Sequence, residues 1–226
     1  MEDILVKWET TLGRDHINCQ EAVFKLGSFY FAAKDYDKSF ALLRESAEAS
    51  ESLPGLEVAK SSYRNALLIA KRADEFNEVA EKELAAAREK YQPHSTELTS
   101  ALAKMAMDYL MVGSPQHAET IMRECLKIRQ QATPDSWNTV YAKLMLGKSL
   151  VDQSKFDEAE LYLVDGYSEF RERIDEVPER ARMILRKESI EWLIQFGQST
   201  KDDRLKEWEA EKSELQSDPM APIANK

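Results

Sequence analysis

The chain has 226 residues, and its formal net charge is −10. This balance argues against nucleic-acid binding, because phosphate contacts need clustered Lys and Arg. Only 7 Gly and 7 Pro interrupt a sequence rich in helix-forming residues, so we expect a few long helices and an all-α protein. No apolar run approaches the ~20 residues of a membrane span, and the acidic start lacks the basic region of a signal peptide.

The predicted helices follow one another along almost the whole chain. They lie at residues 2–12, 17–33, 36–51, 56–73, 75–91, 95–112, 115–131, 135–153, 156–175, 179–197 and 201–215. A small or apolar residue recurs early in the second helix of each pair, at Ser39, Val79, Ala118 and Ala159. The breaks between pairs keep the same intervals, at Arg14, Pro54, Pro93 and Pro134. Two markers with one period near 40 residues predict stacked helix-pair repeats.

Small residues also recur on the first helices of three pairs, at Gly27, Ala106 and Gly147. We expect the second helix to approach closely at these positions, so that a larger side chain would clash. The clearest copies of the pattern span residues 27–43 and 147–163, and the copy at residues 56–90 is degenerate.

This pattern resembles the tetratricopeptide repeat (TPR), and its period resembles the long, kinesin-light-chain-like form. The sequence Leu12-Gly13-Arg14-Asp15-His16 is similar to the Leu-Gly-Pro-Asp-His link between such repeats, with Arg14 in place of proline. The resemblance covers nearly the whole chain. It implies an all-α, right-handed α-solenoid of antiparallel helix pairs, a TPR-like superhelix.

The repeat boundaries follow from the markers and the link. We expect the second helix of a preceding repeat at 1–14, four repeats at 15–53, 54–92, 93–133 and 134–177, a degenerate capping helix pair at 178–216, and a disordered tail at 217–226. The half repeat at the front has two interpretations, a fragment of a longer protein or a capping helix. The link sequence favours the fragment.

The C-terminal third has a narrower resemblance, carried by Ser136-Trp137, Leu146-Gly147, residues 156–160, Gly166-Tyr167 and Trp208. It is similar to the TPR tails of large bacterial, planctomycete-type serine/threonine protein kinases, which implies a kinase domain upstream. The glycine-rich loop, the His-Arg-Asp loop and Asp-Phe-Gly of a kinase are all missing from this sequence. A regulatory or substrate-docking segment of such a kinase is therefore the alternative function, and we expect no catalysis by these residues.

The residues that could carry other chemistry are few. Cys19 and Cys125 show no metal-ligand spacing and suit buried thiols in the reducing cytoplasm. His16 and His94 occupy equivalent inter-repeat links, which favours capping or turn roles, and His117 pairs with neither. We therefore predict no enzyme activity, no metal and no cofactor.

The family resemblance implies a concave groove lined by the first helix of each pair, where a protein or peptide binds. The family's groove positions correspond here to Lys25, Ser28, Phe31, Arg64, Asn65, Leu68, Lys71, Lys104, Met107, Leu144 and Lys148. Five of these are basic and none is acidic, which favours an extended partner with carboxylates or phosphates. The alternative interpretation is a solvated face of lysines. Only Asn65 matches the paired asparagines of a carboxylate clamp, so we expect no such clamp. Self-association is left open.

Overall fold

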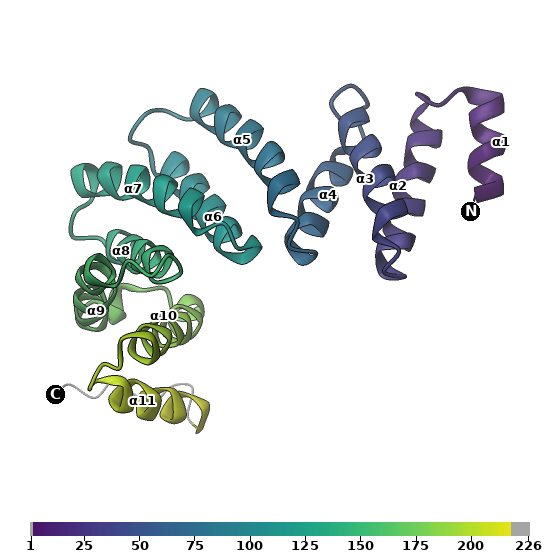
Figure 1. Cartoon of the computed structure of the whole chain (residues 1–226). Helices are drawn as coiled ribbons and strands as arrows, with labels where there is room; N and C mark the ends of the chain where they lie inside the picture. Colours follow the sequence, from purple (N-terminus) through teal and green to yellow (C-terminus); the bar gives the residue numbers. More distant parts are fainter. Residues whose placement is uncertain (1, 218–226) are drawn as a thin grey trace. The chain divides into compact units, whose positions relative to one another are not determined.

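The computed structural model describes residues 2–217, and all regular structure within them is helical (Figure 1). The helices are α1 (Glu2–Leu12), α2 (Ile17–Ala32), α3 (Tyr36–Ala49), α4 (Glu57–Ile69), α5 (Ala73–Lys90), α6 (Thr96–Val112), α7 (Pro115–Ala132), α8 (Trp137–Val151), α9 (Phe156–Glu172), the 3-10 turn η1 (Ile174–Glu176), α10 (Glu179–Thr200) and α11 (Leu205–Ser217). Each α-helix expected from the sequence is present, with ends that differ by at most four residues. The tail predicted to be disordered lies outside the described residues, apart from Ser217 at the end of α11.

The chain divides into two compact units, residues 1–79 and residues 80–226, so α5 contributes to both. In the first unit, α1 packs on α2, α2 on α3 and α3 on α4. Leu5 of α1 joins Cys19, Val23 and Leu26 of α2 in one buried apolar cluster. Apolar burial on one side of each helix is therefore what holds successive helices together.

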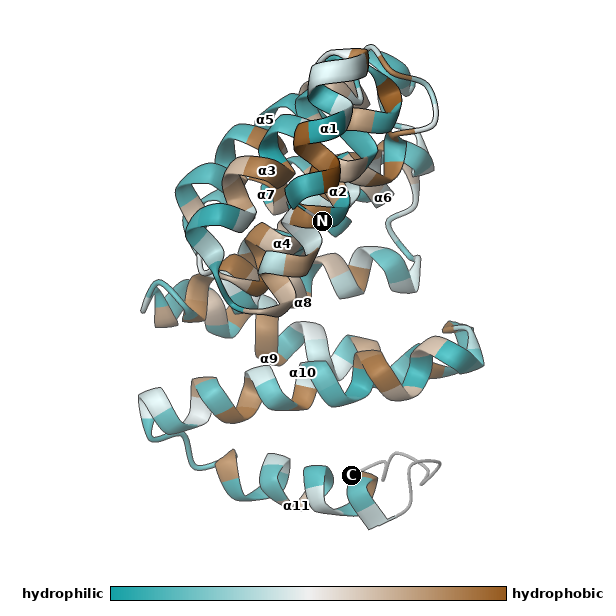
Figure 2. Ribbon diagram, turned by 90° about the vertical axis from the view of Figure 1, so that its right-hand side faces the viewer, coloured by the Kyte–Doolittle hydropathy of each residue, from teal (hydrophilic) through white to brown (hydrophobic). Residues whose placement is uncertain are grey.

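The second unit contains three helix pairs, α6 with α7, α8 with α9, and α10 with α11. Each pair also contacts the next, because α7 packs on α8 and α9 on α10. The first helices of the pairs are neighbours too, since α6 contacts α8 and α8 contacts α10. Figure 2 shows brown, apolar segments at intervals along teal α10 and α11, the pattern of helices that bury one side.

Close approach of paired helices occurs at both predicted glycines, Gly27 and Gly147. A Cβ atom at Gly147 would lie 2.8 Å from the backbone nitrogen of Leu163, and one at Gly27 would lie 3.1 Å from that of Leu43. Ser39, the matching small residue, donates from its hydroxyl to the Gly27 carbonyl at 2.9 Å. These contacts confirm that the glycines are required by packing between the two helices of a pair.

Each helix pair turns through one residue in the left-handed backbone region. These residues are Lys34 (φ 61°), Lys71 (φ 55°), Gly113 (φ 87°), Ser154 (φ 60°) and Lys201 (φ 59°). In the first four turns, the residue after the left-handed one donates a backbone hydrogen bond to the carbonyl five residues earlier. An example is the bond from the Asp35 amide to the Tyr30 carbonyl, and the four distances are 2.8 to 3.0 Å. This bond satisfies a carbonyl that the end of the first helix leaves open, and it fixes where the second helix begins.

The turns correct one prediction, the marker at Val79. Ser39, Ala118 and Ala159 each follow their turn residue by five positions, and the residue five positions after Lys71 is Phe76. Phe76 is fully buried, whereas Val79 is only half-buried. The reason is the length of α4, which has 13 residues against 16 in α2 and 17 in α6, so the second turn comes early.

The residue twelve positions before Ser39, Ala118 and Ala159 is Gly27, Ala106 and Gly147 respectively. Twelve positions before Phe76 stands Arg64, a large residue in place of a small one. Arg64 is buried, and its guanidinium carbon lies 5.6 Å from the centroid of the Phe76 ring. The second repeat thus replaces two small residues by a cation–π pair. This substitution is why its sequence looks degenerate.

Candidate partner-binding face

One side of α6 carries three exposed residues, Ser100, Lys104 and Met111, and the half-buried Met107. Tyr109 of α6 stacks on His117 of α7 with ring centroids 5.0 Å apart, which fixes the side of α6 that faces its pair. Ser100, Lys104, Met107 and Met111 recur at helical spacing on the other side, and Met111 is 56% exposed. Lys104 forms no ion pair with any residue that the structure describes.

The corresponding side of α8 is half-buried, and its polar groups have partners within the chain. Tyr141 and Lys148 occupy the positions of Ser100 and Met107 one repeat later, because both pairs and the two turn residues are 41 residues apart. Tyr141 donates from its hydroxyl to Glu188 of α10 at 2.5 Å. Lys148 forms an ion pair with Asp152, which also accepts a hydrogen bond from Gln195 of α10 at 2.8 Å.

We name these six residues the first-helix face: Ser100, Lys104, Met107, Met111, Tyr141 and Lys148. Since α6 contacts α8, the two rows lie side by side in the second unit. The face combines an unpaired cation, two flexible thioether side chains and an aromatic ring. Such a combination suits contact with a polypeptide better than catalysis.

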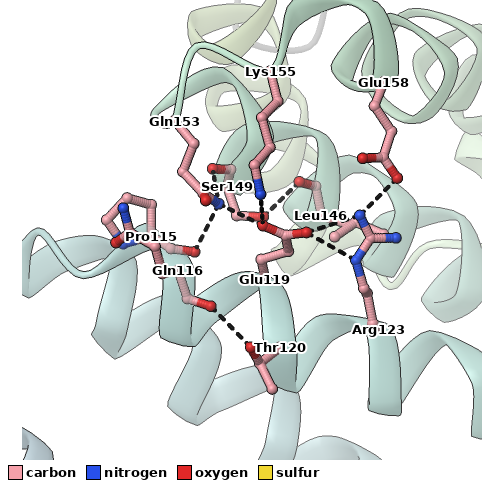
Figure 3. Close-up of polar contacts among 10 residues, drawn as sticks. All are labelled: Pro115, Gln116, Glu119, Thr120, Arg123, Leu146, Ser149, Gln153, Lys155 and Glu158. Atoms are coloured by element: carbon pink, nitrogen blue, oxygen red, sulfur yellow. Dashed lines mark hydrogen bonds and ion pairs between the residues drawn. The ribbon is translucent and has the colours of Figure 1, made fainter.

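The second helices, by contrast, carry cations and carboxylates that neutralise one another. Figure 3 shows Glu119 of α7 accepting from Arg123 at 2.8 Å and from Gln153 and Lys155 at 2.7 Å each, while Arg123 also reaches Glu158 of α9 at 2.6 Å. Burial alone would raise the pKa of Glu119, but these hydrogen bonds outweigh it and lower the pKa to about 2. The network ties the third helix pair to the fourth.

Similar bridges join other second helices or the segments before them. Arg14, which stands in place of the link proline, donates to both carboxylate oxygens of Glu45 in α3 at 2.6 and 2.7 Å. Further bridges are Arg44–Glu75 between α3 and α5, Arg88–Glu124 between α5 and α7, and Arg204–Glu160 between the start of α11 and α9. Exposed pairs of this kind contribute little to stability, so these bridges mark which helices are neighbours more than they hold them together.

No group of side chains within residues 2–217 has the geometry of a metal site. Both cysteines are buried, and burial raises the pKa of the Cys125 thiol, which keeps it protonated and unreactive. His16 caps α2 by accepting from the Asn18 amide at 3.2 Å, as predicted for a link residue. His94 lies in a turn with φ 69°. No helix among the described residues is long and apolar enough to span a membrane.

The comparisons with known proteins agree with this geometry. A model of the tetratricopeptide repeat matches residues 98–135, which span α6, α7 and the link that follows them. Residues 98–135 are thus similar to a tetratricopeptide repeat. The sequence pattern seemed clearer in the first and fourth repeats, yet the third repeat, with Ala106 and Ala118 as its small pair, gives the match.

Two crystal structures resemble almost the whole chain. BtubC (BKLC) from P. vanneervenii has a TM-score of 0.54 at 16% identity, over 92% of this chain and 84% of that chain. A putative kinesin light chain with nearly identical TPR-like repeats, from Podosopora anserina, has a TM-score of 0.53 at 13% identity, over 91% of this chain and 98% of that one. No curated protein sequence matches significantly.

At such identities the likeness shows the fold alone, and it confirms the predicted TPR-like α-solenoid of helix pairs. The predicted repeat boundaries and the resemblance to kinase-linked arrays stay predictions.

Three residues that were predicted to line the groove are buried in the structure, so the prediction is wrong for them. Leu144 is fully buried and contacts Gly166 of its own pair, with its Cδ2 atom 3.3 Å from where a Cβ would stand. Leu68 and Arg64 are also buried, Arg64 against Phe76. A partner cannot reach side chains that pack between the helices.

The other predicted residues of the first unit lie in varied settings. Lys25 is exposed and forms an ion pair with Glu21, and Asn65 is exposed. Ser28 is half-buried and donates to the carbonyl of Phe24 on its own helix. Two others are local structure: Phe31 packs in an aromatic cluster with Tyr36 and Phe40, and Lys71 is the left-handed residue of a turn.

Seven of the eleven predicted residues belong to the first unit and four to the second. Only Lys104, Met107 and Lys148 fall on the first-helix face. Prediction from the sequence missed Ser100, Met111 and Tyr141, although their spacing of four or seven residues from Lys104, Met107 or Lys148 was a usable signal.

Proposed function

We propose that this chain is a non-catalytic protein-binding module and that its first-helix face binds a segment of a partner protein. The observation that supports this proposal is the exposed row on α6, where Lys104 without an ion pair stands among Met107 and a 56%-exposed Met111. An exposed apolar side chain beside an uncompensated charge, with a half-buried methionine next to both, is typical of a binding surface.

The partner's chemistry follows from the same residues. Lys104 attracts a carboxylate or phosphate. The ring of Tyr141 is already covered by Trp192 of α10 and only borders the contact. Methionine side chains adapt to different apolar partners because their thioether chains are flexible. We therefore infer an extended acidic or phosphorylated segment that crosses α6 and α8, neighbouring helices separated by about 8–10 Å.

The test uses a peptide selected on the whole chain from a random display library and measured by fluorescence anisotropy. Lys104→Glu should weaken its binding about tenfold or more and reduce the salt dependence, because it reverses the one unpaired charge of the α6 row. Lys127→Glu is the matched control, since Lys127 is exposed on α7 and forms no ion pair among the described residues. Equal affinity of Lys104→Glu and wild type would refute the proposed face. Arg64 is unsuitable for this test because it is buried.

A further inference from the structure

A second surface lies on the N-terminal part of α10. This helix has 22 residues, seven more than α8, which it contacts. Arg180, Met183, Ile184 and Lys187 follow one another there at spacings of three, one and three residues, so they form one row that we name the α10 stripe. Met183 is 47% exposed and Ile184 is 53% exposed.

The other sides of α10 are occupied. Trp192 and Glu188 meet Tyr141 of α8, with the two aromatic ring centroids 5.9 Å apart. Phe196 packs against Phe156 of α9. Toward α11, a Cβ at Gly197 would lie 3.0 Å from the Trp208 ring, and Arg186 is bonded to Glu211. At 100° per residue, the α10 stripe falls on the side that these contacts leave open.

The stripe's charges have no counterpart within the chain. Arg180 and Lys187 form no ion pair with any described residue, whereas their neighbour Arg182 pairs with Asp175 and Glu191 pairs with Lys212. The α10 stripe thus has two exposed apolar side chains between two cations that form no ion pair. A partner helix complements it if its contact side is also apolar at the centre and is acidic, not basic, at both ends. Such a partner carries apolar residues at its centre and carboxylates four to seven residues apart.

We propose that the α10 stripe is a docking surface for an acidic amphipathic helix of a partner protein. A second copy of this chain fits poorly, because antiparallel pairing of two stripes sets Arg180 of one against Lys187 of the other. A membrane surface also fits poorly, since two cations on a chain of net charge −10 give weak attraction to anionic lipid. This surface is separate from the first-helix face and does not depend on it.

The probe is a synthetic helical peptide with Leu at two central adjacent positions of its packing side and Glu three residues to either side, measured by anisotropy with the whole chain. We expect saturable binding that falls at least about tenfold in the double variant Arg180→Glu, Lys187→Glu and also in Met183→Ser, Ile184→Ser. The same peptide with Lys in place of Glu should bind at least about tenfold more weakly to wild type and better to the charge-reversed variant. Lys127→Glu is the control variant, and an unchanged Tm and circular dichroism spectrum show that each variant is folded.

Absence of saturable binding, or equal binding by the double variant, overturns the proposal. Two further measurements would each overturn the proposal if they gave a positive result. Stripe-dependent sedimentation with vesicles of phosphatidylcholine and phosphatidylserine would assign the surface to lipid. A stripe-dependent dimer in analytical ultracentrifugation would assign it to a second copy. Lys104→Glu should leave binding of this peptide unchanged, so failure here and failure of the first-helix face are distinguishable.

Discussion

The guanidinium group of Arg64 lies 5.6 Å from the ring centroid of Phe76, where the first, third and fourth repeats bring two small residues together. Phe76 is fully buried and Arg64 nearly so. A repeat that has lost its small residues thus keeps its helix pair filled by one large aromatic ring and the arginine stem beside it.

This relationship predicts the effect of truncating the ring. Phe76→Ala should lower the free energy of unfolding by about 3 kcal/mol, because the cavity cannot be refilled by the rigid helices around it. Urea unfolding followed by circular dichroism measures the change. Phe29→Ala is the control, since Phe29 is 55% exposed and should cost less than about 1 kcal/mol. Equal effects of the two substitutions would contradict the assigned packing.

Gly147 gives a second prediction. Its missing side chain leaves room for Leu163, whose backbone nitrogen and Cβ lie 2.8 Å from where a Cβ would stand. Gly147→Ala should therefore destabilise the protein by about 2 kcal/mol, although alanine is the better helix former. Gly166→Ala is the matched control, because its nearest neighbour is the movable Cδ2 of Leu144 at 3.3 Å. A gain of stability in Gly147→Ala would show that the helices are farther apart than described.

The left-handed turns predict stabilising substitutions. Ser154 and Lys71 have φ of 60° and 55°, a region that costs residues with a Cβ about 1 kcal/mol relative to glycine. Ser154→Gly and Lys71→Gly should each raise the free energy of unfolding by up to about 1 kcal/mol. Ala70→Gly, next to Lys71 at φ −81°, should lower it instead. Thermal unfolding of the three variants checks the signs, and a loss of stability in Ser154→Gly would argue against a left-handed turn.

Glu119 predicts a pH dependence. Hydrogen bonds from Lys155, Arg123 and Gln153 lower its folded-state pKa to about 2, against an ordinary value of 4.5. A depressed folded-state pKa adds stability that is fully present above the unfolded pKa and is lost as pH falls from about 4.5 toward 2. Wild type should therefore be more stable than Glu119→Gln at pH 7, and the difference should shrink across that window. A difference that stays constant from pH 7 to pH 2 would contradict the network of Figure 3.

Much of the fold could be predicted from the sequence, because helix-forming composition, turn prolines and two markers agreed on one period. The site could be predicted only in part. Family positions were transferred by counting, and counting failed where α4 is short, which placed Arg64 on the surface and Val79 at the position of Phe76. The α10 stripe was missed because no family motif continues into the last helix pair, although its spacing was visible in the sequence. Left-handed lysines have no sequence signal, since lysine does not favour that conformation.

The most direct test of the binding function is hydrogen exchange of the whole chain with and without a saturating selected peptide. If the first-helix face binds the partner, protection should appear in residues 96–112 and 137–151, and the second helices α7 and α9 should exchange as before. Protection confined to α7 and α9 would contradict the proposed function.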